Sequence, residues 1–303
     1  MKDFRIHLAI LIVVTAVFVG VVSFGSRVSR GQSPSQEKSS RVKTTVLLPE
    51  SRGTSPSTGF MDAAVRNAAL QNELAWVFGN KQQRGWYLYL LLIQQTIETQ
   101  AQPGSSDFAS AVAGWQKKVG LTVNGVLDEE TLRSLFTEWQ TNRLKDKTYA
   151  APDQLLTAPV SDFYDPQRLE ELRQIERNTY AAYKKMLAAA IADPSLNLAH
   201  KPNGELADTE KYFKIISCFR SREYQEKLRR ESPHAGTAGL AINSPHFTGH
   251  ALDLYVGGDP VDTRDSNRAI QVRTPVYQWL VRNAAKFGFR PYFYEPWHWE
   301  YVG

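Results

Sequence analysis

Two short stretches near the C-terminal end decide which fold we expect: SPHFTGHALDL at residues 244–254 and EPWHWEY at residues 295–301. Both carry imidazoles and carboxylates. A catalytic zinc ion takes three protein ligands and keeps one position open, and His246, Asp253 and His298 could supply such a set. Gly249 would let the preceding loop turn back, so that His246 reaches the point where Asp253 lies on a predicted strand.

A carboxylate beside the metal is also needed, because water must lose a proton to become a nucleophile. Glu295 comes three residues before His298 and is the expected general base. Glu300 is the rival for that role, or else an ordinary salt-bridge partner. The residue types alone leave this choice open.

The other histidines fit a metal site less well. His250 follows His246 at the spacing of two ligands on a helix, but no glutamate follows His246 and Gly249 disfavours a helix. We therefore interpret His250 as a non-ligand. His200 and His234 lie in predicted loops and are expected at the surface.

A third segment, IISCFRS at residues 215–221, places Arg220 where a predicted strand passes into a helix. An arginine there could bind a substrate carboxylate or stabilise an oxyanion. A structural salt bridge is the alternative role.

The composition excludes several classes of protein. Of the 303 residues, 42% are hydrophobic and 22% charged, which excludes a disordered, collagen-like or polytopic membrane protein. Lys and Arg number 36 against 31 Asp and Glu, so the net charge of +5 does not indicate a nucleic-acid partner. The single cysteine, Cys218, excludes an intramolecular disulfide and a multi-cysteine metal site.

The N-terminus resembles an export or anchor signal. Residues 8–24 are uncharged and apolar, which is near the lower limit of about 17–25 residues for a membrane-spanning helix. We predict a signal anchor or transmembrane segment at residues 1–25, with a cleaved signal peptide as the alternative. Residues 26–59 are rich in Ser, Gly, Pro and Thr and predict a flexible linker.

Residues 60–140 have helical spacing and predict a small all-helical domain. We expect a first helix that includes Val77 and Phe78, a second over residues 86–97, a third that ends at Gly120, and a fourth capped by Asp128. The polar residues 141–161 predict a linker.

Residues 162–303 predict an α+β domain. The expected helices cover residues 166–192, 222–230 and 274–287, and the expected strands cover residues 212–217, 251–256 and 291–302.

Three motifs in this domain resemble those of the zinc D-alanyl-D-alanine carboxypeptidases and dipeptidases of the VanY/VanX type (peptidase family M15). SPHFTGHALDL is similar to their S-x-H-x-x-G-x-A-x-D-L motif, EPWHWEY to E-x-W-H-W-E-Y, and SCFRSREYQ to S-G-Y/F-R-S-x-x-x-Q. The order and spacing match over residues 162–303. Cys218 departs from the usual glycine. The resemblance implies a Hedgehog/DD-peptidase-type fold.

The resemblance also implies roles for individual residues. It makes His246, Asp253 and His298 the ligands of one Zn²⁺ per chain and Glu295 the catalytic base. Arg220 would contact the scissile carbonyl or the terminal carboxylate. Two further residues, Ser244 and Gln225, would line the substrate site.

The implied function is that of a membrane-anchored zinc metallopeptidase that hydrolyses peptidoglycan stem peptides, as a D-alanyl-D-alanine carboxypeptidase. Its catalytic domain would lie outside the cytoplasmic membrane on a single-pass anchor, or be secreted if the signal is cleaved. The alternatives are an L,D-carboxypeptidase, an endopeptidase, and an inactive cell-wall-binding protein. The oligomeric state is not indicated by the sequence.

The preceding domain has a likeness of its own. Residues 107–136 resemble the second half of a peptidoglycan-binding type 1 repeat, with Trp115 in place of the usual Phe and Asn124 in place of Asp. This implies contact with peptidoglycan. The alternative is a helical spacer that does not bind glycan.

Overall fold

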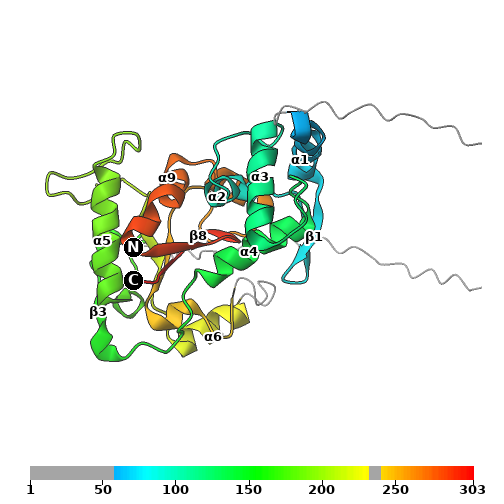
Figure 1. Ribbon diagram of the computed structural model, residues 1–303. Coiled ribbons are helices and arrows are strands. Elements are labelled where there is room, and N and C mark those ends of the chain that lie inside the picture. Colours follow the sequence, from blue (N-terminus) through cyan, green and yellow to red (C-terminus); the bar gives the residue numbers. More distant parts are fainter. Residues whose placement is uncertain (1–57, 232–239) are drawn as a thin grey trace, which may run out of the picture. The chain divides into compact units, whose positions relative to one another are not determined.

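The structure is a computed structural model and describes residues 58–231 and 240–303. The predicted anchor at residues 1–25 lies outside the described residues, as does almost all of the predicted linker at 26–59. In the described ranges, no helix is both long enough and apolar enough to span a bilayer. The described residues belong to one compact unit, which contains all the elements below (Figure 1).

Between residues 58 and 141 the structure contains helices and one β-hairpin. The elements are α1 (Met61–Glu73), β1 (Ala75–Phe78), β2 (Lys81–Arg84), α2 (Leu90–Thr96), α3 (Ser106–Val119) and α4 (Glu129–Thr141). The helix boundaries set by local signals are confirmed. Gly120 follows α3 with a φ of 76°, and the Asp128 side chain accepts a hydrogen bond from the Thr131 N–H at the start of α4.

The prediction of an all-helical domain is wrong at the hairpin. Val77 and Phe78 lie on β1 rather than on α1, and Phe78 pairs with Lys81. The two residues between them, Gly79 and Asn80, have φ values of 55° and 61°. Positive φ at both central residues is the geometry of a two-residue hairpin turn, which glycine and asparagine favour.

The C-terminal part is built on a four-stranded antiparallel sheet in the order β5-β6-β8-β7. Its strands are β5 (Ile215–Ser217), β6 (Ala251–Leu254), β7 (Phe289–Tyr292) and β8 (Glu295–Tyr301). Asp253 pairs with Ser217 on one side and with His298 on the other. Because paired residues point to the same face of a sheet, this register places the three side chains next to one another.

In the described residues, the helices that accompany this sheet are α5 (Arg177–Ile191), α6 (Arg222–Glu231), α8 (Asp265–Gln271) and α9 (Pro275–Asn283). Figure 1 shows the orange helix α9 beside the red strand β8, where the rings of Tyr277 and Trp299 lie 6.4 Å apart. Trp299 is almost completely buried. One face of β8 therefore packs into the core, while His298 points to the other.

Among the predicted elements of the C-terminal part, one helix and one strand differ most from the structure. The helix expected at residues 166–192 begins only at Arg177, because Gln174–Glu176 form strand β4 and pair with β3 (Leu155–Thr157) inside the predicted linker. Ile175 is buried there, so tertiary pairing overrides the helix-forming composition of the segment. The strand expected at residues 291–302 is two strands, β7 and β8, joined by a turn.

The hydrophobic core is continuous between the two predicted domains. Phe136 of α4 stacks on Phe293 with ring centres 4.3 Å apart, and the ring centres of Phe78 and Tyr294 lie 4.9 Å apart. Buried Arg268 on α8 donates a hydrogen bond to the Tyr89 hydroxyl at 3.0 Å. The segment before residue 142 thus packs on the turn that leads into β8, the strand that carries His298.

Candidate metal centre

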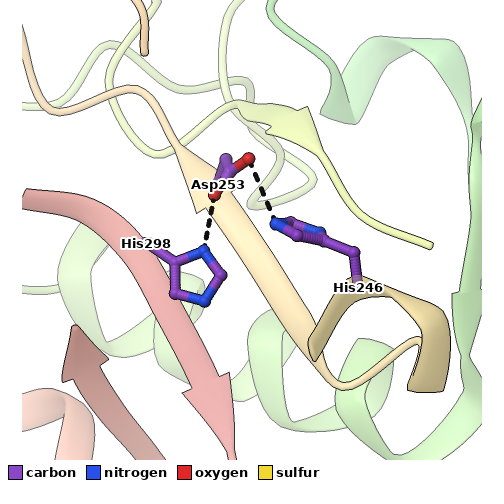
Figure 2. Close-up of side chains that lie close together, drawn as sticks. All are labelled: His246, Asp253 and His298. Atoms are coloured by element: carbon purple, nitrogen blue, oxygen red, sulfur yellow. Dashed lines mark hydrogen bonds and ion pairs between the residues drawn. The ribbon is translucent and has the colours of Figure 1, made fainter. Parts of the chain in front are cut away.

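Three side chains from separate elements meet on one face of the sheet. His246 lies on the 3-10 turn Pro245–Thr248, Asp253 on β6 and His298 on β8. Their ligand atoms all lie within 4.8 Å of one another, and all three residues are buried. Figure 2 shows one imidazole beside each of the two oxygens of the Asp253 carboxylate. The structure therefore brings together the three ligands expected from sequence.

The backbone around His246 explains its position. The Ser244 side chain accepts a hydrogen bond from the His246 N–H at 3.3 Å, and Gly249 ends the turn with a φ of 72°. The His246 Nδ1–H donates to the Cys218 carbonyl at 2.6 Å, which leaves Nε2 facing Asp253 Oδ2 at 3.3 Å. Burial and the charge of Arg220 lower the pKa of His246 to about 4. The ring is therefore neutral, the form that binds a metal.

His298 has a carboxylate at each ring nitrogen. Nδ1 lies 2.9 Å from Asp253 Oδ1, and Nε2 lies 3.2 Å from Glu300 Oε1. Burial opposes the charged ring, but the hydrogen bonds to Asp253 and Glu300 outweigh it and raise the pKa of His298 to about 9. A metal at Nδ1 would replace the proton there, while Nε2–H would keep its bond to Glu300.

Asp253 is the shared partner of the site. Arg220 Nη2 donates to its Oδ2 at 2.5 Å, and Arg220 Nε donates to Ser217 Oγ at 2.9 Å. Burial would raise the pKa of Asp253, but His246, Arg220 and His298 hold it well below its usual range. The carboxylate is therefore ionised, as a metal ligand must be.

This donor set fits a zinc-like ion. Two imidazole nitrogens and one carboxylate oxygen leave a coordination position for water or substrate. The outward nitrogen of each ring is hydrogen-bonded, to the Cys218 carbonyl and to Glu300. Such partners fix ring orientation at metal sites.

Glu295 has the position and the raised pKa that a general base requires. Its Oε2 lies 4.0 Å from His298 Nδ1, and the residue is only 7% exposed. Burial raises its pKa to about 7, against the lowering effect of His298. A carboxyl group with a pKa near neutrality can both accept and return a proton. A nearby cation would favour its ionised form.

Glu300, the rival base, has a different environment. It is fully buried, and His298, Arg143 and the Leu144 N–H all bind its oxygens. Burial would raise its pKa, but the hydrogen bond from His298 and the charge of Arg143 outweigh burial and lower it to about 2. A carboxylate held this tightly is a poor proton acceptor, so the geometry favours Glu295 as the base.

The two residues expected to line the substrate site are buried beside the centre. Ser244 caps the turn that carries His246, and Gln225 lies 3.4 Å from Arg220 Nη1 and donates to the Ala241 carbonyl at 3.1 Å. Their contact with substrate stays a prediction. His250 lies apart from the three ligands, with Nδ1 2.8 Å from Thr179 Oγ. His200 is exposed, and His234 lies outside the described residues.

Sequence reasoning missed two contributors to the site. The Cys218 carbonyl is a backbone group, and no residue type signals it. Arg143 lies 157 residues before its partner Glu300, in a segment interpreted as linker. Only the packing of α4 against the turn before β8 reveals it.

Comparisons with known proteins agree with the motifs. Residues 173–303 match the family model VanY, described as D-alanyl-D-alanine carboxypeptidase, which confirms the recognised resemblance. The chain is similar to the solved LdcB LD-carboxypeptidase, with 23% identity over 52% of this chain and 72% of that chain and a TM-score of 0.36. A second similar structure is a mutant of the vancomycin-resistance D,D-pentapeptidase VanY in complex with Zn(II). The identity is 22% over 45% of this chain and 78% of that chain, with a TM-score of 0.29. None of the curated proteins compared with the chain matches it.

Proposed function

We propose that this chain, whose residues 173–303 form a VanY-type carboxypeptidase domain, is a zinc-dependent D-alanyl-D-alanine carboxypeptidase that shortens peptidoglycan stem peptides. One observation carries the proposal. His246, Asp253 and His298 converge on one buried point with Glu295 beside them. A buried cluster of metal ligands next to a carboxyl group of raised pKa is the arrangement that metal-assisted hydrolysis needs.

The residues of the chain divide the work of the reaction. A Zn²⁺ ion held by the three ligands supplies Lewis acidity to the scissile carbonyl. Glu295 accepts the proton of the attacking water and returns it to the leaving amine, since its pKa of about 7 suits both transfers. Arg220, fixed by Asp253 and Ser217, offers positive charge to the carbonyl oxygen or to the terminal carboxylate.

The rest of the proposal concerns location. Residues 1–25 anchor the chain in the cytoplasmic membrane, or direct its secretion if they are cleaved, and the catalytic domain faces the cell wall. Residues 26–59 are the tether, and residues 60–140 contact peptidoglycan. Two attachments to one polymer raise the effective substrate concentration. The apolar run at residues 8–24 and the likeness of residues 107–136 to a peptidoglycan-binding repeat support these assignments.

The test is mass spectrometry of pentapeptide muropeptides incubated with the zinc-loaded full chain. We compare wild type, Glu295→Ala, and Glu171→Ala as a control at an exposed glutamate. Wild type should remove one terminal alanine. Glu295→Ala should be slower by about 10²–10⁴-fold, because the general base is lost. Glu171→Ala should match wild type.

Other outcomes reassign the function. Hydrolysis of tetrapeptides but not pentapeptides would indicate an L,D-carboxypeptidase, and cleavage of cross-linked dimers an endopeptidase. Equal rates for Glu295→Ala and wild type would refute Glu295 as the base. A zinc-loaded wild type that binds muropeptides and leaves them intact would indicate a wall-binding protein.

A further inference from the structure

The geometry points to Arg143 as a positioning residue of the metal centre, which acts through Glu300 to fix the orientation and tautomer of His298. The inference rests on the metal site of the proposed function, but not on the identity of the substrate. It adds a residue from outside the VanY-matching region to that site.

The first link is between Glu300 and His298. The two residues are separated by one position on β8, so their side chains lie on the same face of the strand. Glu300 Oε1 lies 3.2 Å from His298 Nε2. When a carboxylate accepts the Nε2–H of a neutral imidazole, the lone pair stays on Nδ1, and His298 Nδ1 faces Asp253 and the ligand cluster.

The second link fixes the carboxylate. Arg143 Nε donates to Glu300 Oε2 at 3.1 Å, and Arg143 Nη2 donates to Oε1. The Leu144 N–H also donates to Oε2, at 3.0 Å. Both oxygens are therefore held, and the fork geometry of the guanidinium sets the plane of the carboxylate. Glu300 has no exposed surface, so without Arg143 its buried charge would lose its guanidinium partner and water could not replace it.

The third link holds Arg143 in place. Its guanidinium lies 4.0 Å from the centre of the Tyr292 ring, and Nη1 donates to Gln140 Oε1 at 2.7 Å. Arg143 follows α4 almost directly, and α4 is anchored by the stacking of Phe136 on Phe293. The end of α4 is thus fixed against the turn before β8.

These links form one chain from α4 to the metal ligand. Hydrogen-bonded partners of metal ligands typically change metal affinity by about 10–100-fold when they are removed. We expect Arg143 to have an effect of this size, although it touches neither the metal ligands' donor atoms nor the substrate. The segment before residue 142 would then be part of the functional centre, beyond any contact with the cell wall.

The test measures Zn²⁺ affinity of the full chain by competition with a chelating dye. The variants are Arg143→Met, Glu300→Gln and the double variant. Arg133→Met is the matched control, because Arg133 lies on α4 and pairs with Glu129 in solvent. Thermal unfolding in chelator, without metal, reports whether each variant folds. The double variant carries neither charge, so it avoids an unpaired buried carboxylate if Arg143→Met alone does not fold.

The expected result is a Zn²⁺ dissociation constant raised by about 10–100-fold in Arg143→Met, in Glu300→Gln and in the double variant, with no change in Arg133→Met. The double variant should bind Zn²⁺ no more weakly than the worse single variant, because both substitutions remove the same ion pair between Arg143 and Glu300. Wild-type affinity in the folded double variant would overturn the inference and leave the proposed function intact. A wild-type chain that binds no Zn²⁺ would overturn the metal site itself, and the inference with it.

Discussion

Replacing Gly249 by alanine should destabilise the protein through two separable effects. Gly249 has a φ of 72°, where a side chain adds about 1–2 kcal/mol of strain. A Cβ atom there would also lie 2.9 Å from the Glu176 backbone nitrogen and 3.1 Å from Leu155 Cδ2. Separating these packed segments costs about 1–3 kcal/mol more. The total loss is therefore about 2–5 kcal/mol in the free energy of unfolding.

Two other glycines separate these effects. Gly120 has a φ of 76° but no atom within 4 Å of an added Cβ, so Gly120→Ala should cost only the strain of about 1–2 kcal/mol. Gly114 lies inside α3, and a Cβ there also meets nothing within 4 Å. Gly114→Ala should stabilise the helix by about 0.5–1 kcal/mol.

The assay is denaturant unfolding of the full chain in the presence of a chelator, so that metal binding does not contribute. If Gly249→Ala is no more destabilising than Gly120→Ala, the expected steric cost of a Cβ atom between Gly249 and the strands β3 and β4 is refuted.

Two further predictions concern single titratable groups. Cys218 is fully buried, and burial raises its pKa to about 12. A thiol reagent at about pH 8 should therefore leave the native protein unmodified and label one cysteine in denaturant. Rapid labelling of the native protein would contradict the burial of Cys218. Glu176 caps α5, and although burial opposes it, hydrogen bonds from Asn178 and Thr179 lower its pKa from the usual 4.5. The ionised Glu176 therefore stabilises the folded protein fully at pH values above its pKa in the unfolded chain. This stabilisation is lost as the pH falls through its lower pKa in the folded protein. Glu176→Gln should lower the free energy of unfolding by about 1 kcal/mol at neutral pH, and this difference from wild type should disappear in acid. A difference that does not depend on pH would disprove the role of the Glu176 charge.

The sequence could predict elements whose signals are local. Asp128 and Gly120 mark helix ends because a cap bonds residues only a few positions away. The helix over residues 222–230 was also predicted, and the strand from Ala251 was predicted from the alternation of its residues. Gly79 and Asn80 are also a local signal, because this pair of residues favours a two-residue hairpin turn. The candidate ligands His246, Asp253 and His298, which the structure brings together, could be predicted because their motifs combine residue type with fixed spacing.

Other features depend on contacts that the sequence does not encode locally. Residues 174–176 belong to a segment of helix-forming composition, yet they form β4 because β3 offers backbone partners and Ile175 becomes buried. The difference in pKa between Glu295 and Glu300 has the same origin. Both are glutamates of one strand, and only the positions of their neighbours raise the pKa of one to about 7 and lower that of the other to about 2.

The sequence by itself determined which residues can bind a metal ion and which helix ends are capped, because residue chemistry and short-range hydrogen bonds are properties of a few neighbouring positions. The tertiary structure alone decided the strand register that pairs Asp253 with His298, and the contact between Arg143 and Glu300. Such contacts join segments far apart along the chain. They form only where packing of the core brings those segments together and leaves buried charges no other partner.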